Sequence, residues 1–134
     1  MPDFGNPALK PLEFIGGSKK DLSTFPDPVK QDMGYALFEA QQGNRAPSVK
    51  TLQGFGGGGV VEIVEDHDGE TYRCVYTTRL KAAVYVLHVF QKKSRHGSQT
   101  PKHEMSLVNV RLKEAERQDR QTGALRSDQT RNLS

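Results

Sequence analysis

The chain has 134 residues, 34% of them hydrophobic and 26% charged, with a net charge of +3, and this predicts one small domain. No apolar run approaches the roughly 18 residues of a membrane-spanning helix, and the N-terminus lacks the apolar core of a secretory signal. The single cysteine, Cys74, excludes a disulfide framework and a cysteine-rich zinc site. We therefore expect a cytoplasmic protein without membrane contact, metal or other cofactor.

The charges are distributed unevenly along the chain. Residues 1–70 carry 6 basic and 11 acidic side chains, whereas residues 71–113 carry 9 basic side chains and a single acidic one, Glu104. A basic block with interleaved aromatic residues indicates a polyanionic partner. An ordinary solvated sheet face and helix is the alternative, and charge alone does not separate the two.

The N-terminal segment predicts a lead-in, a strand and a short helix. Residues 1–10 contain two prolines and a glycine and are expected to be flexible. A short strand is expected over residues 12–15. Ser18 begins a helix with Asp21 as its capping partner, and Pro26 ends it.

A second, longer helix is predicted directly after this proline. Asp27 is a favourable N-cap, Pro28 suits the first helical position, and Gly43 is a natural C-terminal stop. The apolar residues between these limits follow a helical period: Val29, Met33, Ala36, Leu37 and Ala40.

From residue 60 onward the pattern changes to strands. Residues 60–65, 71–78 and 83–91 are rich in β-branched and aromatic side chains, which favour strands. Asp68-Gly69 between the first two is a tight-turn signal. Three consecutive strands with short connections predict an antiparallel meander.

A third helix is predicted to begin after Thr100-Pro101, and residues 118–134 are expected to form a disordered tail. The domain then covers residues 11–117. The predicted class is α+β, an antiparallel meander with two N-terminal helices and one C-terminal helix. The apolar residues of the third helix also fall at helical spacing: Met105, Val108, Leu112 and Ala115.

Arg73 falls in the middle of the predicted central strand. An arginine there is costly unless its sheet face opens to water or to an anion. Lys92 and Lys93 end the next strand, so several cations are expected on one phosphate-binding face. The alternative is an Arg73 that pairs with Glu62 or another carboxylate of the sheet.

Two other side chains on the predicted strands bear on chemistry. His88 lies between Leu87 and Val89, where a buried, hydrogen-bonded histidine is favoured over a catalytic one. Cys74 is interpreted as a small buried thiol.

A series of short motifs covering residues 10–117 resembles the HigB-like toxins of the RelE/ParE superfamily, in particular their phage-derived, host-toxic branch. Each motif is weak alone, and their order and spacing make the resemblance specific. The motifs are Pro11–Ile15, Tyr35–Phe38 with Gln41–Gly43, Gly59–Ile63, Tyr72-Arg73-x-x-Tyr76, Leu87–Lys93 and Thr100–Glu104.

The resemblance implies a RelE-like, microbial-RNase-like sheet covered by helices. It implies the toxin of a type II toxin–antitoxin system that inhibits translation as a metal-independent mRNA interferase. The implied partners are a HigA-like helix-turn-helix antitoxin and mRNA, free or on the ribosome. In relatives the arginine of the Tyr-Arg-x-x-Tyr strand binds the scissile phosphate, which matches Arg73, and the basic pair matches Lys92 and Lys93.

The expected reaction is endoribonucleolytic, by attack of a ribose 2′-OH on the adjacent phosphate. Arg73 and Lys93 would stabilise the charge of the transition state. Candidates for the general base or acid are Lys92, Glu62 and His88, in that order. Further basic residues would contact the RNA backbone: Lys50, Arg79, Lys81, Arg95 and Lys102.

Two departures from the family pattern leave other functions open. RelE-type enzymes carry lysines where this chain has Glu62 and Val64, so the proton-abstracting group is not identified. The alternatives are a ParE-like inhibitor of DNA gyrase and a catalytically inactive RNA-binding relative. The basic pair after Phe90 favours the RNase.

Overall fold

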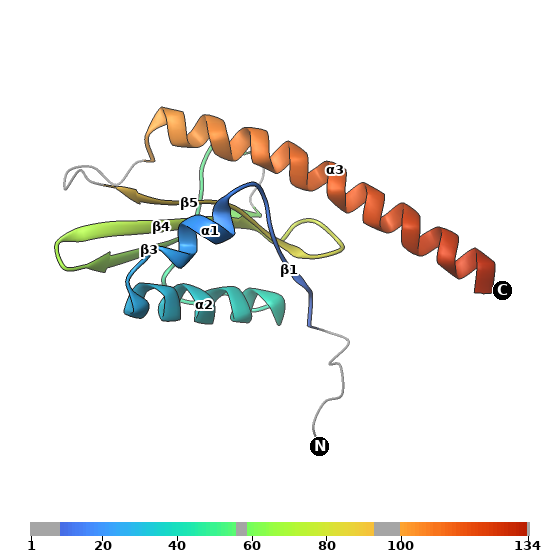
Figure 1. The fold of residues 1–134 in the computed structure, drawn as a ribbon, viewed down its shortest axis with the longest axis horizontal. Coiled ribbons are helices and arrows are strands. Elements are labelled where there is room, and N and C mark those ends of the chain that lie inside the picture. Colours follow the sequence, from blue (N-terminus) through green and yellow to red (C-terminus); the bar gives the residue numbers. More distant parts are fainter. Residues whose placement is uncertain (1–8, 56–58, 93–99, 134) are drawn as a thin grey trace, which may run out of the picture.

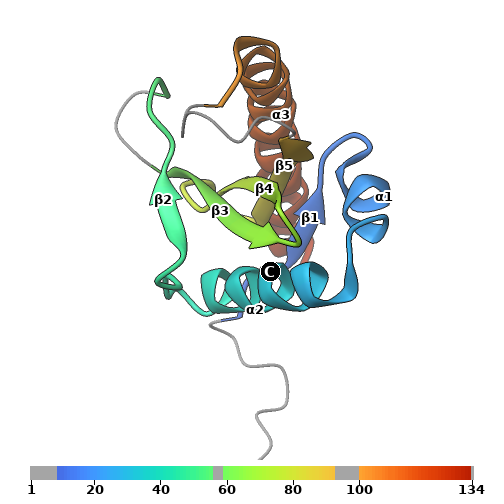
Figure 2. The same cartoon turned by 90° about the vertical axis from the view of Figure 1, so that its left-hand side faces the viewer.

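The computed structural model describes residues 9–55, 59–92 and 100–133. One five-stranded sheet lies between α2 on one face and α3 on the other (Figures 1 and 2), so the predicted α+β class is confirmed. The strand order is β1-β5-β4-β3-β2. The elements are β1 (Leu12–Phe14), α1 (Ser18–Ser23), α2 (Asp27–Gln41), β2 (Val49–Thr51), β3 (Val60–His67), β4 (Glu70–Thr77), β5 (Val84–Lys92) and α3 (Lys102–Leu133).

The centre of the sheet is the predicted antiparallel meander, and its two edges add to it. Asp68 and Gly69 form the β3–β4 turn with φ values of 55° and 83°, as a two-residue hairpin turn requires. β1 pairs in parallel with β5, and β2 pairs antiparallel with β3. The sheet is therefore mixed, and β2, unlike β1, was not predicted from the sequence.

Each face of the sheet has its own apolar core, and strand alternation decides which side chains enter which core. The apolar residues predicted along α2 and α3 form the helix side of these two cores. The core on the α2 face includes Met33, Leu37, Ile63, Cys74 and Tyr76. The core on the α3 face includes Val60, Val75, Leu87, Val108 and Leu112.

The predicted capping box of α1 is wrong. The N-cap of α1 is Gly17, and no side chain caps the helix. Ser18 is buried, and its hydroxyl donates to the carbonyl of Val86 at 3.3 Å. The serine therefore fastens α1 to β5 instead of capping its own helix.

α3 continues to Leu133, where a disordered tail was expected from residue 118. Most residues of this C-terminal part favour helix, and it contains no proline that would end the helix. Asp119 accepts hydrogen bonds from the N–H groups of Lys81 (3.1 Å) and Ala82 (2.7 Å) and from the Tyr85 hydroxyl (3.1 Å). These bonds fasten α3 to the β4–β5 loop beyond residue 117, a contact that composition alone does not reveal.

Lys10, just before the predicted start of the domain, is bonded to the end of α2. Lys10, expected in the flexible lead-in, donates its backbone N–H to Gln41 at 2.9 Å, and the Gln41 side chain donates to the Lys10 carbonyl at 2.7 Å. Residues 1–8 lie outside the described ranges. The domain limits at residues 11 and 117 stay a prediction.

Asp119→Asn should lower the free energy of unfolding by about 1 kcal/mol at pH 7. Burial alone would raise the pKa of Asp119, but the N–H groups of Ala82 and Lys81, the Tyr85 hydroxyl and the charge of Lys10 lower it below its ordinary value. The stabilisation is complete above the ordinary carboxyl pKa of about 4 and is lost as the pH falls through the lower pKa of the folded state.

Urea unfolding of the wild type and the Asp119→Asn variant at pH 7 and pH 3 measures this difference. Glu13→Gln, which removes an exposed carboxylate on β1, is the control and should leave stability unchanged. A difference that persists unchanged at pH 3 would show that the Asp119 carboxylate is not its source.

Within the described ranges, no helix combines the length and the apolar character needed to cross a bilayer.

Candidate functional site

A buried ion pair lies on the α3 face of the sheet. Arg73 on β4 donates from Nη1 to Oε1 of Glu62 on β3 at 2.9 Å, and the side chains are 5% and 7% exposed. Val64 is the register partner of Arg73, so Glu62 is its diagonal neighbour on the same face. The expectation that this face leaves Arg73 open to water is therefore wrong, and the carboxylate-paired alternative is the observed arrangement.

Thr100, just before α3, forms hydrogen bonds with both members of the pair. Its hydroxyl donates to Oε2 of Glu62 at 3.2 Å and lies 3.4 Å from Nη1 of Arg73, which donates to it. Nε of Arg73 is buried and has no hydrogen-bond partner among the described residues. A buried N–H without a partner costs about 1–3 kcal/mol, so this guanidinium retains a donor that a bound anion could satisfy.

Lys92, at the end of β5, adds a third charged group. It is 8% exposed and stands opposite Thr71 in the register. Loss of solvent and the positive charge of Arg73 lower the pKa of Lys92 below its ordinary value, and the charge of Glu62 partly offsets this. A lysine with a lowered pKa gives up its proton more readily than an exposed lysine does.

A cavity of about 390 Å³ opens beside the pair. Glu62 and Thr100 lie on its wall, and Arg73 lies behind them. Lys50 on β2 stands opposite Glu62 in the strand register and is exposed at the cavity rim. The remaining lining residues are Thr51, Leu52, Gln53 and Met105.

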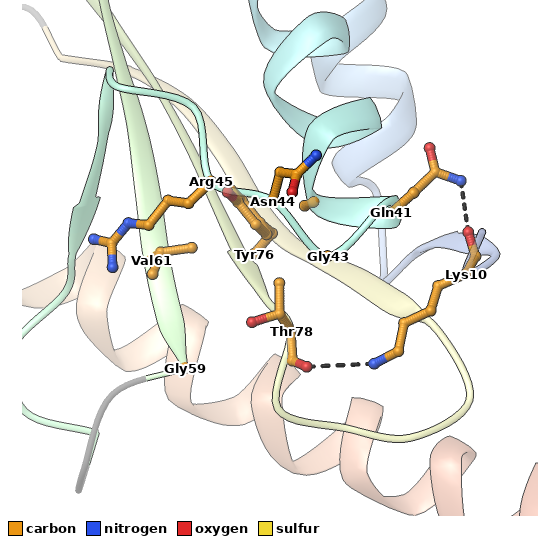
Figure 3. Close-up of a pocket in the computed structure, with 10 residues that line it drawn as sticks. Lys10, Gln41, Gly43, Asn44, Arg45, Gly59, Val61, Tyr76 and Thr78 are labelled. Atoms are coloured by element: carbon orange, nitrogen blue, oxygen red, sulfur yellow. Dashed lines mark hydrogen bonds between the residues drawn. The ribbon is translucent and has the colours of Figure 1, made fainter. Parts of the chain in front are cut away.

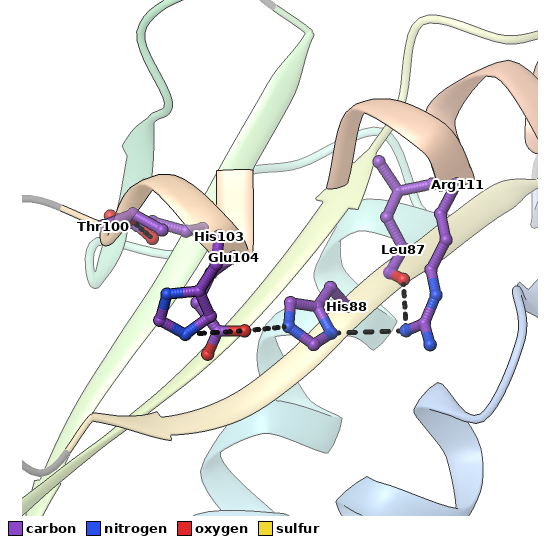
Figure 4. A network of polar contacts seen from close by, with 7 residues as sticks. Leu87, His88, Thr100, His103, Glu104 and Arg111 are labelled. Carbon is purple, nitrogen blue, oxygen red and sulfur yellow. Dashed lines mark hydrogen bonds and ion pairs between the residues drawn. The ribbon is translucent and has the colours of Figure 1, made fainter. Parts of the chain in front are cut away.

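His88 belongs to a second polar network, between β5 and α3 (Figure 4). Arg111 donates from Nη1 to the Leu87 carbonyl at 3.1 Å and to Nδ1 of His88 at 3.2 Å. Since an arginine can only donate, Nδ1 accepts, and Nε2 carries the proton that it donates to Glu104 at 2.9 Å. Both ring nitrogens are engaged, so the interpretation of His88 as a buried, satisfied histidine is confirmed.

The remaining predicted cations do not form one patch. Lys93 and Arg95 lie outside the described ranges. Arg79 pairs with Glu116 at 3.4 Å, and the backbone of Lys81 bonds to Asp119. Because α3 rises 1.5 Å per residue, these two lie about 20–25 Å from Lys102 at its start. Among the predicted cations that the structure describes, Lys50, Lys92 and Lys102 belong to the segments that surround the Glu62–Arg73 pair.

Three residues of these networks were not predicted as functional. Thr100 was interpreted only as part of a helix start, and Glu104 and Arg111 were not considered for polar contacts with the sheet. Glu104 is the single acidic residue among residues 71–113, and that isolation was a usable signal. Nothing in the local pattern distinguishes Arg111 from the exposed basic residues of α3.

The fold and the site together define a RelE-like α+β protein with a buried charged centre on one sheet face. Residues 20–113 match the family model described as phage-derived protein Gp49-like (DUF891), and the chain belongs to this family. The family is of the RelE/HigB toxin type and is associated with the toxins of toxin–antitoxin systems, so an antitoxin partner is implied in general terms. A search of curated proteins gave no match.

Proposed function

We propose that this toxin is a metal-independent mRNA interferase of a type II toxin–antitoxin pair. The observation that supports the proposal most is the Glu62–Arg73 pair with Lys92 near it: Glu62 lines an open cavity, and Nε of Arg73 has no partner among the described residues. Buried charges with perturbed proton affinity are typical of sites that move protons or bind phosphate. A carboxylate, an ammonium and a guanidinium can supply the general base, the general acid and the charge stabilisation that RNA transesterification needs.

In the proposed reaction, Glu62 removes the proton of a ribose 2′-OH, and the 2′-oxygen attacks the adjacent phosphorus. The bond from phosphorus to the 5′-oxygen breaks, and Lys92 donates a proton to that oxygen. The products are a 2′,3′-cyclic phosphate and a free 5′-OH. Arg73 stabilises the negative charge on the phosphorane oxygens, and Lys93 shares this role, as the family resemblance implies.

Glu62 is proposed as the general base ahead of Lys92, because Glu62 lines the cavity and Lys92 is not among its described lining residues. Glu62 lies on the cavity wall, whereas both ring nitrogens of His88 are occupied by Glu104 and Arg111. His88 is therefore better suited to hold β5 against α3 than to move protons. Thr100 must release Oε2 of Glu62 when RNA binds, since this oxygen is otherwise occupied.

Around this centre, the exposed Lys50 and Lys102 would contact phosphates that flank the cleaved bond. Affinity should then fall as the salt concentration rises, because binding releases counterions from the RNA. Arg79 and Lys81, which contact α3 near its middle at Glu116 and Asp119, would contact RNA only outside the immediate site.

We further propose a HigA-like helix-turn-helix protein as the antitoxin. Such a partner would neutralise the toxin by covering residues 71–113 or the flanking helices. A complex in which the antitoxin touches none of these surfaces would contradict masking.

The proposed activity is tested by inducing the protein in a bacterial host and mapping RNA ends, with gyrase supercoiling assayed in parallel. We expect new 5′-OH and 2′,3′-cyclic phosphate ends, no effect of chelators on cleavage by the purified protein, and normal supercoiling. Inhibited supercoiling with intact RNA would indicate the ParE-like alternative. RNA that is bound but not cut would indicate an inactive relative.

A further inference from the structure

A second cavity, of about 360 Å³, lies on the opposite face of the sheet, at the C-terminal end of α2. Its walls come from α2 and the following loop, from β3 and β4, and from the segment before β1 (Figure 3). Its volume lies within the usual range of small-molecule sites, about 300–1,000 Å³. Nothing in the proposed RNase chemistry uses this cavity.

Tyr76 is the most unusual residue of the lining. It is 1% exposed, and its hydroxyl has no hydrogen-bond partner among the described residues. Unlike Nε of Arg73, this hydroxyl is not fully enclosed by the described residues, so it reaches the cavity, where a bound ligand can accept its hydrogen bond. Burial, with Cys74 adding to it and Arg45 opposing it, raises the pKa of Tyr76 to about 12, so at neutral pH this hydroxyl keeps its proton and can donate it.

The charge of the lining is positive. Lys10 and Arg45 line the cavity, and no carboxylate does among its described lining residues. Lys10 donates from Nζ to the carbonyls of Leu80 (2.8 Å) and Thr78 (3.4 Å), which leaves one of its three ammonium hydrogens. The charge of Lys10 helps to lower the pKa of Asp119, whose oxygens already accept from the backbone of Lys81 and Ala82.

The rest of the lining divides into a polar and an apolar part. The Asn44 side chain adds an amide without a hydrogen-bond partner among the described residues, next to Gln41, whose amide is used by the Lys10 carbonyl. Ala40, Val61 and the ring of Tyr76 form an apolar surface. The cavity thus offers a donor and positive charge beside a small apolar wall.

We propose that this cavity binds a small organic anion, a carboxylate or phosphate group attached to a compact apolar body. The anionic group accepts the hydrogen bond of the Tyr76 hydroxyl and is attracted by Lys10, and the apolar body lies against Val61 and Ala40. The sheet separates this site from Glu62 and Arg73, because Tyr76 and Arg73 belong to opposite faces of β4. The proposal therefore does not depend on the proposed function.

Titration of the isotope-labelled full chain, followed by NMR, tests the proposal with four probes: benzoate, phenyl phosphate, inorganic phosphate and the neutral benzamide. We expect saturable shifts around Val61 and Tyr76 at millimolar benzoate or phenyl phosphate, and at least about tenfold weaker binding of benzamide. The tighter of the two aromatic anions identifies the head group, and weaker binding of inorganic phosphate shows that the apolar body contributes.

Two tyrosine variants provide the matched comparison. Tyr76→Phe should weaken anion binding by about tenfold without lowering stability, because the lost hydroxyl has no hydrogen-bond partner among the described residues. Tyr85→Phe removes a hydroxyl bonded to Asp119 on the α3 face and should leave anion binding unchanged. Equal affinity for benzamide, unchanged binding by Tyr76→Phe, or no saturable shifts with either aromatic anion would overturn the proposal.

Discussion

RNA cleavage should fall about 10²- to 10³-fold when Arg73 is replaced by lysine, as it does when a preorganised charge-stabilising donor is lost. Lysine keeps the positive charge beside Glu62, so the buried carboxylate retains a counter-ion, but it lacks the planar fork and the Nε–H of arginine. The variant thus separates phosphate recognition from mere charge balance. The measurement is the single-turnover rate of cleavage of a short RNA, with growth arrest as the cellular readout.

Lys113→Ala is the matched control, because it also alters one basic side chain but at an exposed position of α3. Its cleavage rate should stay close to that of the wild type. Glu62→Gln should slow cleavage by about 10²- to 10⁴-fold if Glu62 is the general base. A folded Arg73→Lys protein with the full rate would refute the role proposed for the guanidinium.

The second large effect concerns stability. Arg73→Met should lower the free energy of unfolding by about 3–5 kcal/mol, because it leaves the Glu62 carboxylate buried without its hydrogen-bonded counter-charge. Replacing both residues by methionine should recover most or all of this loss, since apolar side chains of similar volume often stabilise a buried site as well as an ion pair does. Urea unfolding at pH 7 measures all three proteins.

The control for this comparison is the exposed pair of Arg117 and Glu114 on α3. Arg117→Ala should scarcely change stability, because solvent screens such a pair. If the double methionine variant were as unstable as the single one, the loss would reflect packing of the Arg73 side chain and not an uncompensated charge.

The double variant also clarifies the function of the pair. A stable but inactive double variant would mean that the ion pair is retained at a cost in stability for the sake of activity. It would further show that a loss of growth arrest in Arg73 variants is not simply a loss of folded protein. The stability of typical domains is only about 5–15 kcal/mol, so this separation is needed.

Local patterns predicted most of the elements correctly. The period of α2 from Val29 to Ala40, the alternation of β4 and the Asp68-Gly69 turn each depend on neighbours within a few residues. The places where prediction failed depend on distant partners. β2 exists because it pairs with β3, and Ser18 does not cap α1 because its hydroxyl is used by Val86.

The site divides in the same way. Strand alternation was sufficient to place Arg73 on the face away from Cys74 and to suggest Glu62 as its possible partner. It could not show that Thr100 bonds with both members of that pair, or that Glu104 and Arg111 bond to the two ring nitrogens of His88. These contacts join residues from α3 to the sheet, and their separation in the chain carries no periodic signal.

The sequence alone determined the α+β class, the helical stripes, the meander and the resemblance to toxins. Each of these depends on short-range periodicity or on the order of motifs. Tertiary structure alone decided that Arg73 is paired and enclosed and that the basic residues are divided between the start and the middle of α3. It also decided that Tyr76 lines a cavity, with a hydroxyl that has no hydrogen-bond partner among the described residues. Burial and pairing of charge depend on which distant segments pack together, and a one-dimensional pattern does not contain that information.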